Sequence, residues 1–184
     1  MSEVAVTTRR SFGRRALAAV AAALAGDALA LPPAARAADQ HGLLERAFEH
    51  EAKAAAAYRA AARDRRLGRR VRTLAGRFAG HHDDHLTALG FALRGVGAGT
   101  PSRPRGVAGL STALAGGDAA FATLALGLEE AGLGACLEAQ AVLADPRQAL
   151  IVGSIATGNA QHLVVLRELL GRDPLPRAFE TGVT

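Results

Sequence analysis

The sequence predicts an all-α protein, a bundle of four long helices with a long crossover between the second helix and the third. Alanine, leucine and arginine dominate the composition, tryptophan is absent and tyrosine occurs once. Because strands are enriched in β-branched and aromatic residues, this composition favours helices. Four segments repeat apolar residues at steps of three and four, which is the period of one buried helical face.

The first helix is expected over about residues 40–63, with Asp39 as its N-terminal cap. Its apolar stripe carries Glu51 and, seven residues later, Tyr58, and Glu51 falls inside the stripe instead of beside it. The turn over residues 64–70 is short and rich in arginine, so the second helix is expected to pack antiparallel to the first.

The second helix is expected over about residues 69–94 and contains half of the chain's histidines. One face continues at steps of four, three and four through Phe78, His82, His85 and Leu89. His81, at the edge of this stripe, forms a pair with His85 at the spacing of a zinc-protease helix, but the glutamate of that motif is missing. Since an unpaired buried polar group is costly, these imidazoles need partners, and metal ligation is one way to supply them.

Residues 95–117 are rich in Gly, Pro, Ser and Thr, so they are expected to form the crossover along the bundle. The third helix is expected over about residues 119–144, capped by Asp118 and carrying Glu129 in its apolar face. Three glycines there each cost a helix roughly 1 kcal/mol relative to alanine. They either weaken this helix or indicate close backbone contact with a neighbour: Gly127, Gly132 and Gly134.

The fourth helix is expected over about residues 146–170, because Asp145 supplies a cap and the proline after it suits a first helical turn. Its apolar face carries Asn159 and His162. Residues 172–184 are expected to form an extended tail. The bundle itself is therefore expected to occupy residues 38–171.

The N-terminal residues 1–37 are expected to be an export signal. Arg9 and Arg10, with an aromatic residue two places later and then a further basic residue, are similar to a twin-arginine signal. The apolar run over residues 16–25 is too short to span a membrane, and residues 35–37 offer a small-x-small cleavage site. We expect the chain in the periplasm, the cell envelope or the medium. The twin-arginine machinery is then a partner, and membrane contact occurs only through an uncleaved signal.

The charge and the cysteine count exclude other classes of function. Five of the 22 basic residues precede Ala38, against two of the 17 acidic ones, so the remainder is close to neutral and nucleic acid is not expected as a partner. The single Cys136 excludes an intrachain disulfide and a cysteine-rich zinc site. It is expected to be a small buried filler.

Polar residues fall near the middle of the apolar face in all four helices, so a bundle would bring them to one level of the core. They are Glu51, His82 with His85, Glu129, and Asn159 with His162. Clusters of carboxylates and imidazoles inside a bundle are typical of di-iron and di-manganese sites. Oxygen ligands suit hard divalent ions, and imidazole adds affinity for iron, manganese or zinc.

Over about residues 39–171 the chain resembles the ferritin-like superfamily, and in particular the exported bacterial ferritin-like domain proteins. The pattern of that family has a glutamate with an aromatic residue seven places later on the first and third helices. Glu51 and Tyr58 match it on the first helix. Glu129 matches it on the third, with Cys136 in the place of the aromatic residue.

The same family carries Glu-x-x-His on the second and fourth helices. His85 and His162 match the histidines, but His82 and Asn159 stand where the two bridging glutamates belong. The resemblance therefore implies a degenerate metal site that binds a single divalent ion. Its ligands would be Glu51, His82, His85, Glu129 and His162, with Tyr58 and Asn159 as hydrogen-bonding neighbours or weak ligands.

Two functional hypotheses remain open at the level of the sequence. In the first, the degenerate site binds iron, manganese or zinc, and any redox activity would be metal-dependent reduction of dioxygen or peroxide. In the second, no metal is bound, and buried Glu–His pairs fix the packing of a structural or interaction module of the cell envelope. The arginine-rich turn or the crossover would then present the partner surface.

Overall fold

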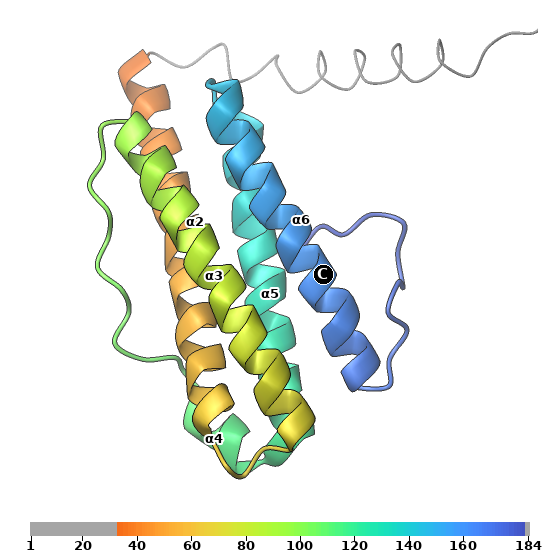
Figure 1. Cartoon of the computed structure of the whole chain (residues 1–184). Coiled ribbons are helices and arrows are strands. Elements are labelled where there is room, and N and C mark those ends of the chain that lie inside the picture. Colours follow the sequence, from red (N-terminus) through yellow and green to blue (C-terminus); the bar gives the residue numbers. More distant parts are fainter. Residues whose placement is uncertain (1–32, 183–184) are drawn as a thin grey trace, which may run out of the picture. The chain divides into compact units, whose positions relative to one another are not determined.

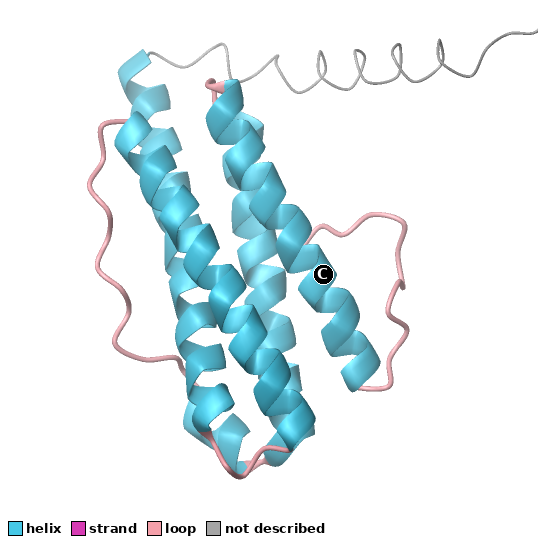
Figure 2. Cartoon of the chain, viewed as in Figure 1, coloured by secondary structure: helices cyan, strands magenta, loops and turns pink. Residues whose placement is uncertain are grey.

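A computed structural model describes residues 33–182 of the chain, and every regular element within that range is a helix (Figure 2). The elements are α2 (Pro33–Arg63), α3 (Arg69–Gly95), α4 (Leu110–Ala115), α5 (Gly117–Val142) and α6 (Pro146–Leu169). The bundle belongs to a compact unit that spans Ala38–Thr184. The paired arginines Arg9 and Arg10 lie outside the described residues.

The helices α2, α3, α5 and α6 lie side by side, and helices joined by a short turn run in opposite directions (Figure 1). The segment after α3 runs back along the bundle to α4, which leads into α5 (Figure 1). The prediction of an all-α bundle with a long crossover is therefore confirmed. The helices α5 and α6 are also long and apolar enough to cross a membrane, a composition that core helices of bundles share.

The start of α2 differs from the sequence-based prediction. The helix begins at Pro33, so Asp39 lies inside it and is not its N-terminal cap. Proline is favoured in the first helical turn, because its fixed φ suits the helix and its missing N–H would have no partner there. The candidate cleavage site at residues 35–37 therefore falls within the first turns of α2.

The start of α3 depends on a residue of α5. Gly68, the N-cap residue of α3, has no side chain to offer, and its backbone N–H donates to Oδ1 of Asp118 at 2.7 Å. The prediction that Asp118 caps its own helix is wrong, because α5 begins one residue earlier, at Gly117. The Asp118 carboxylate instead connects the beginning of α5 to the beginning of α3 through this hydrogen bond.

The ends of α6 are as predicted. The Asp145 side chain accepts a hydrogen bond from the backbone N–H of Arg147 at 2.8 Å, and a proline follows in the first turn. The helix ends just before Gly171, whose positive φ of 66° favours glycine. The C-terminal tail then returns along the bundle, held by Arg167, whose guanidinium donates to Oε2 of Glu180 at 3.1 Å.

Candidate metal centre

The polar residues of the four apolar faces meet in the core. Five of them are at most 3% exposed: Glu51 of α2, His82 of α3, Glu129 of α5, and Asn159 and His162 of α6. His82 is 1% exposed, so it is a core residue, as its place in the apolar stripe predicts. His85 is half-buried. The structure therefore brings together every ligand candidate that the sequence indicated.

Two glycines make room for these side chains. A Cβ on Gly132 of α5 would lie 3.0 Å from Nδ2 of Asn159 and 3.4 Å from Oε1 of Glu51. A Cβ on Gly158 of α6 would lie 3.0 Å from Nε2 of His85. Of the two alternatives left open for the glycines of the third helix, close contact with a neighbour applies to Gly132, whereas Gly127 has open space beside it.

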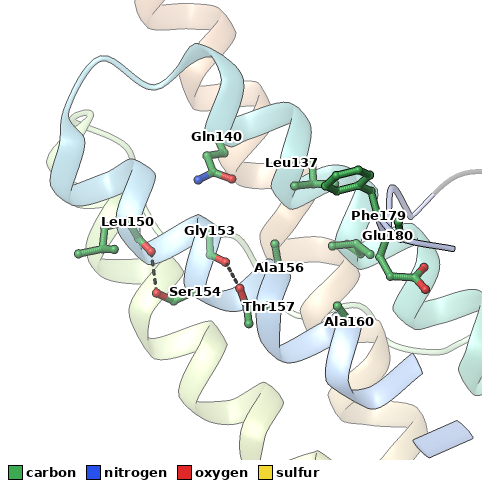
Figure 3. A pocket seen from close by; sticks show the side chains of 12 residues that line it. Leu137, Gln140, Leu150, Gly153, Ser154, Ala156, Thr157, Ala160, Phe179 and Glu180 are labelled. Atoms are coloured by element: carbon green, nitrogen blue, oxygen red, sulfur yellow. Dashed lines mark hydrogen bonds between the residues drawn. The ribbon is translucent and has the colours of Figure 1, made fainter. Parts of the chain in front are cut away.

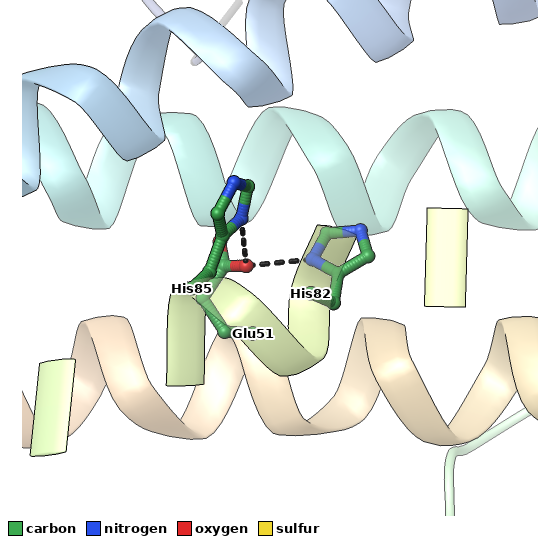
Figure 4. A group of neighbouring side chains, drawn as sticks. All are labelled: Glu51, His82 and His85. Atoms are coloured by element: carbon green, nitrogen blue, oxygen red, sulfur yellow. Dashed lines mark hydrogen bonds and ion pairs between the residues drawn. The ribbon is translucent and has the colours of Figure 1, made fainter. Parts of the chain in front are cut away.

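Glu51 is held by three neighbours. Its Oε2 lies 2.6 Å from Nδ1 of His82 and 2.8 Å from Nδ1 of His85 (Figure 4). Its Oε1 accepts a hydrogen bond from the amide of Asn159 at 2.7 Å. Both oxygens of this carboxylate therefore have donors.

Glu129 is held through one oxygen only. Its Oε1 accepts from the hydroxyl of Tyr58 at 2.6 Å and lies 3.0 Å from both Nε2 of His82 and Nδ1 of His162. Within the described residues, its Oε2 and the Oδ1 of Asn159 are buried without a hydrogen-bond partner. Two buried oxygens of the centre are therefore left without a donor.

The charges of the centre follow from this geometry. Burial opposes charge on Glu51, but hydrogen bonds from His82 and His85 outweigh it and lower its pKa to about 2. Burial likewise opposes charge on His82, but its contacts with Glu129 and Glu51 raise its pKa to about 10. The pKa of Glu129 is lowered, because hydrogen bonds from His162 and His82 overcome its burial. Two carboxylates thus face one imidazolium, and one negative charge remains uncompensated among these three groups.

His162 is fixed from three sides. Its ring stacks on Phe78 with the centroids 3.8 Å apart, and its Nδ1 faces Glu129. Its Nε2 lies 2.9 Å from Nδ1 of His81, an exposed residue of α3. The sequence pattern assigns His81 no contact of this kind; the available signal is its position four residues before His85.

Two groups of three side chains could hold a metal ion. One contains Glu51, His82 and His85, and the other contains His82, Glu129 and His162. The ligand atoms of each group lie within 4.8 Å of one another, and His82 belongs to both. Carboxylate oxygen together with imidazole nitrogen suits iron, manganese or zinc.

A cavity of about 580 Å³ lies elsewhere, between α5, α6 and the tail. Leu150 and Phe179 are among its lining residues, and none of the ligand candidates lines it (Figure 3).

Cys136 is fully buried, and burial raises the pKa of its thiol, which agrees with the expected role as a filler.

Comparison with known proteins agrees with this architecture. The model of the ferritin-like domain family matches residues 39–172, which is nearly the stretch over which the sequence shows its resemblance. No curated protein and no solved structure gives a significant match.

Proposed function

The chain belongs to the ferritin-like domain family, and on that premise we propose that it binds a single divalent metal ion in the core of its bundle. Glu51, Glu129 and His162 would be ligands, together with His82 and His85. The observation that carries the proposal is the pair of three-residue groups that share His82. Iron, manganese and zinc are the candidate ions.

The donor set fits one cation. Buried acceptors without partners are costly, and both Oε2 of Glu129 and Oδ1 of Asn159 lack one within residues 33–182. The excess of negative charge among Glu51, Glu129 and His82 points the same way. A divalent ion would supply the missing positive charge and accept lone pairs from these oxygens.

The donor set does not fit a pair of iron ions bridged by carboxylates. Glu51 and Glu129 are the two carboxylates buried in this part of the described core. The positions of the bridging glutamates hold His82 and Asn159, and both ring nitrogens of His82 already face a carboxylate. Without the two bridging glutamates, the site has too little negative charge to offset two divalent ions. We therefore propose that it binds one ion.

Tyr58 and Asn159 would orient the ligands. The Tyr58 hydroxyl donates to Glu129 and the Asn159 amide donates to Glu51, so each carboxylate is held by a neutral donor from a different helix. Such outer contacts fix ligand geometry before the ion arrives. A bound ion would supply Lewis acidity there. Reduction of dioxygen or peroxide stays a hypothesis to assay once the ion is known.

The proposal is tested by thermal unfolding of metal-free protein with and without added iron, manganese or zinc. An ion that binds only the folded state adds about 2.7 kcal/mol to the free energy of unfolding at 100 times its Kd. The variant Glu51→Gln should lose that gain. The matched control Glu49→Gln, at an exposed side chain that pairs with Lys53, should keep it.

The competing hypothesis is a metal-free module. It is favoured by one observation: both ring nitrogens of His82 lie within hydrogen-bond distance of a carboxylate, one of Glu51 and one of Glu129. It predicts that neither metal nor chelator changes the unfolding temperature of the unaltered protein. That result would overturn the metal-binding proposal and leave the Glu–His contacts as a device that fixes helix packing.

We also propose that the protein is exported by the twin-arginine route. The support is the sequence around Arg9 and Arg10, which lies outside the described residues. Replacing both arginines by lysine should retain the protein in the cytoplasm, which cell fractionation would show. Export of this variant at the level of the unaltered protein would contradict the assignment.

A further inference from the structure

His81 is an exposed histidine that contacts a buried one. It lies on α3, and its Nδ1 is 2.9 Å from Nε2 of His162 on α6. The two rings are nearly parallel, with an interplanar angle of 15° and centroids 5.2 Å apart. The contact therefore joins the solvent-exposed surface of the bundle directly to a residue of the candidate metal centre.

We propose that His81 is a positioning residue for His162: it holds the imidazole ring in the orientation in which Nδ1 can bind the metal ion. This inference rests on the proposed metal-binding function. His81 itself is not a ligand in this account, because it contacts the nitrogen of His162 that faces away from Glu129.

The two ring nitrogens of an imidazole have different roles when a metal ion is bound. A neutral histidine that binds a metal through one nitrogen carries its proton on the other, and the partner of that second nitrogen decides which form is present. In His162 the nitrogen toward the centre is Nδ1, 3.0 Å from Oε1 of Glu129. Without metal, this Nδ1 carries the proton and donates to Glu129. A metal ion bound at Nδ1 would require the proton on Nε2 instead, and that N–H would then donate a hydrogen bond to Nδ1 of His81.

The orientation of the His162 ring is fixed in the same way. Phe78 stacks on its face at 3.8 Å, which sets the plane of the ring. His81 and Glu129 then hold the two nitrogens, which prevents a flip of the ring within that plane. Partners of this kind are worth roughly 10- to 100-fold in metal affinity.

The exposure of His81 makes the inference testable without unfolding the core. We would titrate metal-free protein with cobalt(II) and follow its absorption bands in the unaltered protein and in three variants. His81→Ala removes the acceptor, and His81→Asn restores one close to the position of Nδ1. His41→Ala removes a half-buried histidine of α2 that pairs with Glu45 and serves as the matched control.

The expected result is a roughly 10- to 100-fold loss of cobalt affinity in His81→Ala, with most of it recovered in His81→Asn and none lost in His41→Ala. The stability of the metal-free variants should follow the opposite order. Asparagine is a poorer helix former than alanine, so His81→Asn should be the less stable of the two. A purely structural role of His81 could not produce both orders.

Two results would count against the inference. Equal cobalt affinity in His81→Ala and the unaltered protein would overturn it while leaving the metal-binding proposal intact. Absence of cobalt binding by the unaltered protein would overturn both.

Discussion

At the scale of single residues, His82 decides the charge of the centre. The two nitrogens of its imidazole face Glu51 and Glu129. Without metal, both of these contacts are hydrogen bonds to carboxylates, so both nitrogens carry a proton. With metal, at least one of these protons must leave, because a metal ligand needs a free lone pair.

This arrangement predicts two opposite pH dependences. The pKa of His82 is raised from 6.5 to about 10 on folding, so its contribution to stability is complete below pH 6.5 and is lost as the pH rises toward 10. Metal affinity should instead increase over that range. Chemical denaturation and metal titration at a series of pH values would measure both. His82→Gln should flatten the first dependence; an unchanged slope would contradict the assignment.

Gly132 and Gly127 allow a matched comparison on one helix. Gly127→Ala should stabilise the protein by up to about 1 kcal/mol, because its site is open and alanine is the better helix former. Gly132→Ala should destabilise it by roughly 1–3 kcal/mol, because the new methyl group would press on the buried Asn159. Chemical denaturation of both variants checks this. Stabilisation by Gly132→Ala would show that Asn159 can move aside.

At the scale of elements, Asp118 couples two helix starts. Loss of an N-terminal cap costs about 1 kcal/mol, so Asp118→Ala should lower the free energy of unfolding by that amount through α3, although the residue belongs to α5. Asp118→Asn keeps an oxygen acceptor for the Gly68 N–H and should lose less. Urea denaturation compares them; equal stability of all three proteins would refute the capping role.

Periodicity and cap residues predicted most of the helices. The bounds of α3 and α6 follow from the apolar steps around Phe78 and from Asp145 with its proline, which are local signals. Local patterns did not predict that α2 starts at Pro33 or that Asp118 accepts a hydrogen bond at the start of α3. A side chain that caps a distant helix leaves no local pattern, because its partner is 50 residues away.

At the scale of the whole molecule, the location of the centre was predictable but its contacts were not. Four apolar stripes that each carry a polar residue must bring those residues together once the helices pack. Which nitrogen of His82 faces which carboxylate depends on helix rotation and offset, which periodicity does not specify. The contact between His81 and His162 is of the same kind, since it joins residues of α3 and α6.

The most direct test of the account is the metal content of the exported protein, measured by mass spectrometry after purification without a nickel column. We expect close to one divalent ion per chain, and we expect it to be lost in the double variant Glu51→Ala, His162→Ala. An unaltered protein without metal, even after anaerobic addition of iron, manganese or zinc, would contradict it and leave a metal-free bundle on a ferritin-like scaffold.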